Sequence, residues 1–135
     1  MRFIVSAMSA ALLTSLGCSV ANSAPCPSIL PGWTTPAMGR PAYWVVNEVT
    51  TDRGEIRWNG VPIDEERLVA YLKLAARMDP VPFLVFEPGN SNCKDAKRVR
   101  DLIDRNYPCG DGACGQGARA EFDAAPSKET NRPPA

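Results

Sequence analysis

This 135-residue chain contains no histidine, so the side chains that could do chemistry belong to its fifteen acidic residues, its lysines and tyrosines, and its five cysteines. Without histidine, the Ser-His-Asp and Cys-His catalytic arrangements and every zinc site with a histidine ligand are excluded. Fifteen basic residues balance the acidic ones, so the net charge is zero. A general nucleic-acid binder needs a basic excess, and we therefore expect no nucleic-acid partner.

Four of the cysteines predict two disulfides. Cys26, Cys93, Cys109 and Cys114 lie outside the N-terminal apolar stretch and are even in number, which is typical of a protein in an oxidising compartment. Cys109 and Cys114 bracket a glycine-rich tetrapeptide that can close a tight loop, so we pair them, and Cys26 is left to pair with Cys93. The alternatives are a zinc site and a redox pair. Zinc favours closely spaced cysteine pairs, and a thiol oxidoreductase favours C-x-x-C.

The N-terminal stretch indicates export. Arg2 precedes an uncharged run over residues 3–21, which predicts a signal peptide over 1–21 that is cleaved after Ala21. Two alternatives remain. Leu-Gly-Cys at 16–18 is similar to the end of a lipobox, which would make Cys18 a lipidated N-terminus, and the run is long enough to stay as a membrane anchor. We expect a periplasmic or secreted protein that contacts a membrane only if Cys18 is lipidated or the signal is retained.

A polar turn is the first candidate binding site. Glu87, Ser91 and Asn92 lie between a predicted strand and the start of a predicted helix, a position where open α/β sheets bind ligands. Ser91, Asn92 and backbone N–H groups could hold a small anion or polar ligand. A helix-capping turn explains the same residues without a ligand.

Acid–base chemistry would have to come from carboxylates. Glu48, Glu55 and Glu87 are the candidates for a small histidine-free hydrolase, but no sequence feature places them in an apolar cleft that would shift their pKa values. We therefore expect these side chains to face solvent, and we assign no catalytic residue, no metal ligand and no cofactor.

The elements that position these residues begin with a hairpin. Residues 43–50 and 55–58 are predicted strands around a turn at 51–54, and Asn59-Gly60 marks a second turn. Trp44 and Trp58 could form a cross-strand pair. A more hydrophobic strand is expected at 81–86.

Two helices are predicted, at 64–78 and 93–106. Asp64 should cap the first, whose apolar stripe would face the core, and the charged face of the second should be solvated. The expected core residues of the first are Leu68, Tyr71, Leu72, Ala75 and Met78, and those of the second are Ala96, Val99, Leu102 and Ile103.

This order predicts an α+β fold: a small, disulfide-stapled two-layer sandwich in which a β-hairpin is followed by helix, strand and helix, with the helices on one face of a short sheet. The domain should span residues 43–117. A proline-rich extended segment at 22–42 precedes it, and a disordered tail at 118–135 follows, although 118–122 could add a short strand.

The hairpin and first helix resemble the periplasmic domain of the ExbD/TolR biopolymer-transport family over about residues 44–106. That family has a Gly-x-Ile-x-x-Asn-Gly-x-Pro-Val hairpin leading into a Glu-x-Leu helix, then an apolar strand ending in a polar or acidic residue, as at 83–87, and a second helix, as near 98–104. The matching residues here are Gly54, Ile56, Asn59, Gly60, Pro62, Ile63, Glu66 and Leu68.

The resemblance implies a non-enzymatic envelope domain that binds a protein partner or self-associates through a sheet edge. The family's acidic transmembrane helix is missing, because residues 3–21 contain no Asp or Glu, so proton coupling is not implied. A Cys- and Gly-rich segment also replaces the family's last strand. The alternatives are a stapled secreted binding module unrelated to transport and the small hydrolase.

Overall fold

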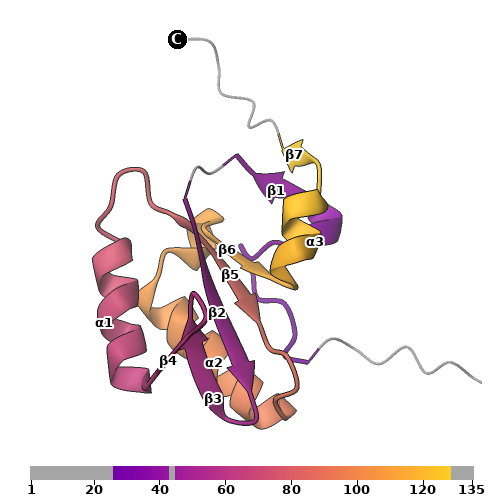
Figure 1. The fold of residues 1–135 in the computed structure, drawn as a ribbon. Helices are drawn as coiled ribbons and strands as arrows, with labels where there is room; N and C mark the ends of the chain where they lie inside the picture. Colours follow the sequence, from indigo (N-terminus) through magenta and orange to yellow (C-terminus); the bar gives the residue numbers. More distant parts are fainter. Residues whose placement is uncertain (1–25, 43–44, 129–135) are drawn as a thin grey trace, which may run out of the picture.

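The computed structural model describes residues 26–42 and 45–128 (Figure 1). The predicted signal peptide at 1–21, the lipidation of Cys18 and the Trp44–Trp58 pair therefore fall outside the described residues, at least in part.

The predicted hairpin is present, with its first strand shifted toward the turn. Strand β2 (Val46–Asp52) pairs antiparallel with β3 (Glu55–Trp58), and β3 pairs with β4 (Val61–Ile63). Arg53-Gly54 and Asn59-Gly60 each take positive φ at both positions, which is the geometry of the two-residue turns that match strand twist. The first turn therefore needs two residues, and β2 extends to Asp52.

The hairpin belongs to a mixed sheet of order β4-β3-β2-β5-β6. Strand β5 (Phe83–Glu87) runs parallel to β2 on one side and to β6 (Cys114–Gln116) on the other. Its first four residues are buried, as expected of an interior parallel strand covered on both faces. The Cys- and Gly-rich segment is thus itself a strand of the sheet.

Helices α1 (Glu65–Ala75) and α2 (Cys93–Asn106) cover one face of this sheet and enclose the main core (Figure 1). Asp64 and Asn92 cap them by accepting N–H bonds from Arg67 and Asp95. The α+β fold with these two helices on one face is as predicted. Helix α1 ends at Ala75 rather than 78, because turns precede Pro80, and Met78 is exposed rather than in the core.

A third helix, α3 (Arg119–Ala124), packs on the opposite face. Phe122 is buried there against Phe83, with ring centroids 5.6 Å apart. Gly115 makes room, since a Cβ atom at Gly115 would lie 2.5 Å from the Phe122 ring. The expected short strand at 118–122 is wrong, because these residues begin α3.

Residues 118–128 were predicted to be part of a disordered tail, but they are ordered in the structure. Strand β7 (Ser127–Lys128) follows α3 and pairs parallel with β1 (Arg40–Pro41). The single buried ring of Phe122 supplies the apolar anchor that the polar composition of this segment concealed.

The proline-rich segment lies against the domain. Residues 26–34 lie beside α2 and β6, with a turn at 31–32, and we call them the strap. A short 3-10 helix, η1 (Pro36–Met38), and β1 follow, while a second 3-10 helix, η2 (Cys109–Asp111), leads into β6. Trp33 is buried in the main core, so the strap is part of the folded domain.

Candidate functional site

Both predicted disulfides are present and have structural positions. Cys26–Cys93 joins the start of the strap to the first residue of α2, and Cys109–Cys114 closes the loop before β6, with Cα separations of 5.4 and 4.8 Å. Within residues 26–42 and 45–128, no three cysteine or acidic side chains are grouped to hold a metal ion.

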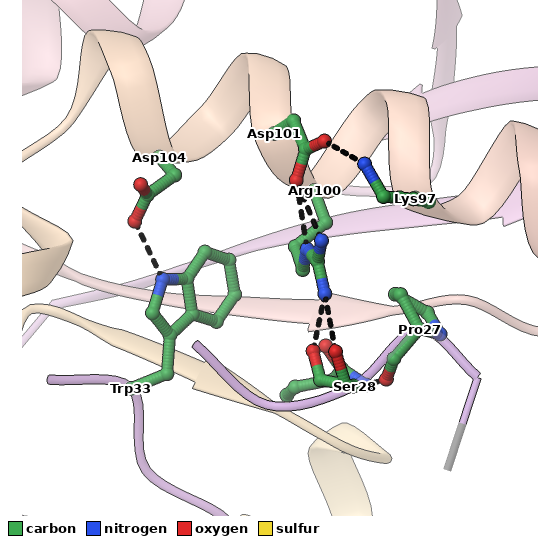
Figure 2. Close-up of polar contacts among 8 residues, drawn as sticks. Pro27, Ser28, Trp33, Lys97, Arg100, Asp101 and Asp104 are labelled. Carbon is green, nitrogen blue, oxygen red and sulfur yellow. Dashed lines mark hydrogen bonds and ion pairs between the residues drawn. The ribbon is translucent and has the colours of Figure 1, made fainter. Parts of the chain in front are cut away.

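The strap is held to α2 and β6 by polar bonds from buried side chains (Figure 2). Arg100 donates to the carbonyl and hydroxyl of Ser28, and Gln116 Nε2 donates to the Pro27 carbonyl at 2.7 Å. Trp33 Nε1 donates to Asp104 at 2.8 Å. Because these groups are occupied by the strap, the cluster is a structural clamp.

Arg100 corrects the expectation of a fully solvated outer face on α2, since only 3% of this residue is exposed. Its guanidinium needs a counter-ion, and the partly exposed Asp101 supplies one at 2.7 Å. The hydrogen bond from Lys97, together with those from Arg100, holds the pKa of Asp101 below its usual value.

The rest of the α2 charged face is solvated. Lys97 pairs with Asp101, and Arg98 pairs with Glu65 of α1. A shallow hollow of about 300 Å³ lies among exposed side chains of this face, which are Lys94, Lys97, Arg98, Asp101 and Arg105.

The residues of the polar turn have separate roles. Asn92 caps α2, accepting the Asp95 N–H at 2.8 Å and donating to the Asp95 carboxylate at 2.9 Å. Among the described residues, the partly buried Ser91 hydroxyl has no hydrogen-bond partner. Glu87 lies on the α3 face of the sheet, so these three residues do not form one ligand site.

Glu87 joins a different group of carboxylates. Its pKa is raised by partial burial and by the nearby charges of Glu48 and Glu121, against a lowering hydrogen bond from the Arg119 backbone. Glu48 and Glu87 are therefore close, whereas Glu55 pairs with Arg57 at 2.6 Å. A carboxyl group with a raised pKa can act as a general acid. The cavity beside Phe122 on this face has only about 20 Å³, enough for a water molecule.

The feature that sequence reasoning missed is an apolar groove between α1 and the end of the hairpin. Asn47, Trp58, Tyr71, Leu74, Ala75 and Met78 line this α1–β3 groove, whose volume is about 280 Å³. Trp58 and Tyr71 meet edge to face, with centroids 5.5 Å apart. Tyr71 and Met78 were expected in the core, but both are exposed on the groove side.

Exposed apolar side chains concentrate at this groove. Leu74 is 65% exposed and Met78 50%. Val61 is the cross-strand partner of Trp58 and extends the same patch. Of the six large hydrophobic side chains exposed in the described residues, Tyr71, Leu74 and Met78 line the groove and Val61 adjoins it. The signal in the sequence was Leu74, an apolar residue off the core stripe of its helix.

The two edges of the sheet are poor sites for strand addition. At β6 the strap already pairs, since Thr34 N–H donates to the Cys114 carbonyl at 3.0 Å and Gln116 N–H donates to the Thr34 carbonyl at 2.9 Å. At β4, Pro62 lies opposite Arg57, next to the pair that closes the turn, so its nitrogen faces outward. Proline has no N–H, so this edge lacks a donor there.

Comparisons with protein-family models, curated proteins and solved structures find no match for this chain. In residues 26–42 and 45–128, no helix combines the length and apolar character needed to cross a bilayer. The fold and the distribution of its surface groups therefore carry the functional argument.

Proposed function

We propose that this chain is a non-enzymatic interaction domain of the bacterial envelope, similar to the periplasmic domain of the ExbD/TolR family. The order of hairpin, α1, β5, α2 and β6 supports the resemblance, because it follows the hairpin, helix, strand, helix and final strand of that family. The two disulfides support an oxidising compartment.

One observation carries the proposed role: of the six exposed large hydrophobic side chains in the described residues, three line the α1–β3 groove and a fourth, Val61, lies opposite its Trp58. Grouped apolar exposure of this kind marks contact sites in proteins that are otherwise well packed. Glu87, by contrast, has neighbouring carboxylates but adjoins only a water-sized cavity near Phe122. A role in protein binding therefore explains the surface features of this domain better than a catalytic role does.

The expected location is the periplasm or the secreted fraction, with membrane attachment through Cys18 as the lipoprotein variant. Mass spectrometry of the mature N-terminus separates cleavage after Ala21 from lipidation of Cys18. A transport-associated role predicts partners in the cell envelope, whereas a stapled module unrelated to transport predicts partners outside it.

The proposed function is tested by photo-crosslinking in the envelope of the native host. A photoreactive residue is placed in turn at Leu74 in the groove, Lys94 on α2 and Thr50 on the α3 face of the sheet, all in the full-length chain. We expect at least one position to give a discrete adduct whose partner is an envelope protein, identified by mass spectrometry. The absence of adducts at all three positions would contradict an interaction role.

A further inference from the structure

The size of the α1–β3 groove indicates what can occupy it. Pockets for small molecules usually measure roughly 300–1,000 Å³ and enclose most of the ligand. This groove has about 280 Å³ and lies open along α1, so it suits a single large apolar side chain presented by a protein. Since the strap pairs with β6 and Pro62 removes a donor from the β4 edge, we expect the partner to dock against side chains rather than extend the sheet.

The charges beside the groove restrict the partner further. The residues that line it carry no charge. Along α1 and the turn after it, two cations, Arg67 and Arg77, lie next to the residues that line the groove. Arg67 precedes Tyr71 by four residues and Arg77 follows Leu74 by three, which are the spacings of neighbours on a helix surface.

The acidic residues of α1 lie at the end of the helix that is away from Leu74. Glu65 and Glu66 lie in the first turn of α1, and Glu65 is paired with Arg98 of α2, on the other side of the helix. A second copy docked groove to groove would bring the same cations together, and like charges at an interface oppose association.

We propose that the α1–β3 groove binds a partner segment in which one large apolar side chain is flanked by acidic residues. This inference rests on the proposed interaction role. The apolar side chain fills the space between Trp58 and Leu74, and the acidic neighbours lie near Arg67 and Arg77. The apolar contact supplies most of the affinity, and the charges select the partner.

The test is a selection of random peptides displayed on phage against the disulfide-bonded mature protein, with counter-selection against Leu74→Glu. Leu74 is exposed, so this variant should fold, and Met38→Glu serves as a matched control because Met38 is 49% exposed away from the groove. We expect enriched peptides to carry a large apolar residue beside Asp or Glu. A synthetic copy of one should lose at least about tenfold in affinity to Leu74→Glu and none to Met38→Glu.

Charge reversal provides the second arm. Arg67→Glu should weaken the acidic peptide by up to about fivefold, and high salt should shrink the difference. Enrichment of neutral or basic peptides, or equal binding to Leu74→Glu, would overturn the proposal. Sedimentation showing a dimer that Leu74→Glu dissociates would identify a second copy as the occupant and overturn it as well. If instead the crosslinks form at Lys94 or Thr50 alone, the interaction role stands and the groove assignment fails.

Discussion

The strap side and the groove side of this domain differ in how their side chains are covered. On the strap side, a disulfide, a buried arginine and a tryptophan join residues 26–34 to α2 and β6. On the groove side, α1 and the hairpin leave apolar side chains in solvent. The strap side is therefore reinforced by covalent and buried polar contacts, whereas the groove side leaves apolar surface available for contact.

The largest expected effect comes from removing the disulfide of the strap side with Cys26→Ala and Cys93→Ala. This bridge spans a sequence separation of 67, and the chain-entropy estimate gives a loss of about 4 kcal/mol in the free energy of unfolding. Denaturant unfolding followed by fluorescence measures it. The Cys109–Cys114 loop has a separation of only 5, for which the loop-closure contribution is about 2 kcal/mol. An unchanged midpoint in the first variant would show that the strap needs no covalent support.

Asp101→Asn should be next, because it removes the counter-ion of the buried Arg100 and costs about 1–3 kcal/mol at neutral pH. The pKa of Asp101 is lowered in the folded state, so its contribution is present above the usual pKa and is lost as the pH falls through the folded value. Unfolding curves of variant and parent should therefore converge in acid. Asp123→Asn, which breaks an exposed pair with Arg119, is the matched control and should change little.

Alanine substitutions at two glycines test how closely the strap is packed. The two glycines have nearly the same positive φ, so the substitutions cause similar backbone strain. Gly32 and Gly60 have φ of 83° and 84°, but a Cβ atom at Gly32 would lie 2.7 Å from the backbone of Gly110, while Gly60 faces open space. Gly32→Ala should therefore cost about 1–3 kcal/mol more than Gly60→Ala, measured by thermal unfolding. An equal loss of stability in the two variants would mean that the backbone around Gly32 moves aside as easily as the open turn at Gly60.

Glu87→Gln should have a smaller effect of the opposite sign. The pKa of Glu87 is raised in the folded state, so the folded protein holds its proton more tightly and loses stability as the pH rises through that range. The variant should be slightly more stable than the parent at neutral pH and equal to it in acid. Measuring the free energy of unfolding across pH distinguishes the two variants. Asp101→Asn is less stable than the parent at neutral pH and approaches it in acid, whereas Glu87→Gln is more stable at neutral pH. A Glu87→Gln protein that is less stable at neutral pH would contradict the assignment.

The smallest change in stability is expected on the groove side. Leu74→Ala should alter the free energy of unfolding by no more than about 0.5 kcal/mol, because Leu74 is 65% exposed. Leu72→Ala, two residues earlier and fully buried, should cost about 2–5 kcal/mol. A large loss at Leu74 would mean that the groove is part of the core and that the contrast between the two sides is false.

Local patterns were enough to predict the hairpin, the bounds of α2 and both disulfides. Turn glycines and capping residues determine structure over a few residues, as at Gly54 and Asn92. The disulfides were predicted from the even number of cysteines and the short spacing before Cys114. The α3 helix could not be predicted in this way, because it depends on Phe122 meeting Phe83 across the sheet, a contact between distant segments.

The groove was hidden for a related reason. Helical spacing placed Tyr71 and Met78 with the core residues of α1, but the sheet is not wide enough to cover them, and the helix ends before residue 78. Arg100 shows the converse, since a charged residue that the pattern placed in solvent is covered by the strap. At both places, burial depends on whether a segment distant in the sequence covers the side chain: the sheet in the case of α1, and the strap in the case of Arg100. The periodicity of a helix does not show how far such a segment extends.

The bridge between Cys26 and Cys93 also determines how the domain responds to tension. A pull that enters along the chain at residue 26 crosses directly to the start of α2 through the covalent bond. The chain between the two cysteines, which includes β2, β3, β4, α1 and β5, is bypassed and cannot be drawn out. Tension therefore passes to the residues after 93 without stretching the segments that line the groove.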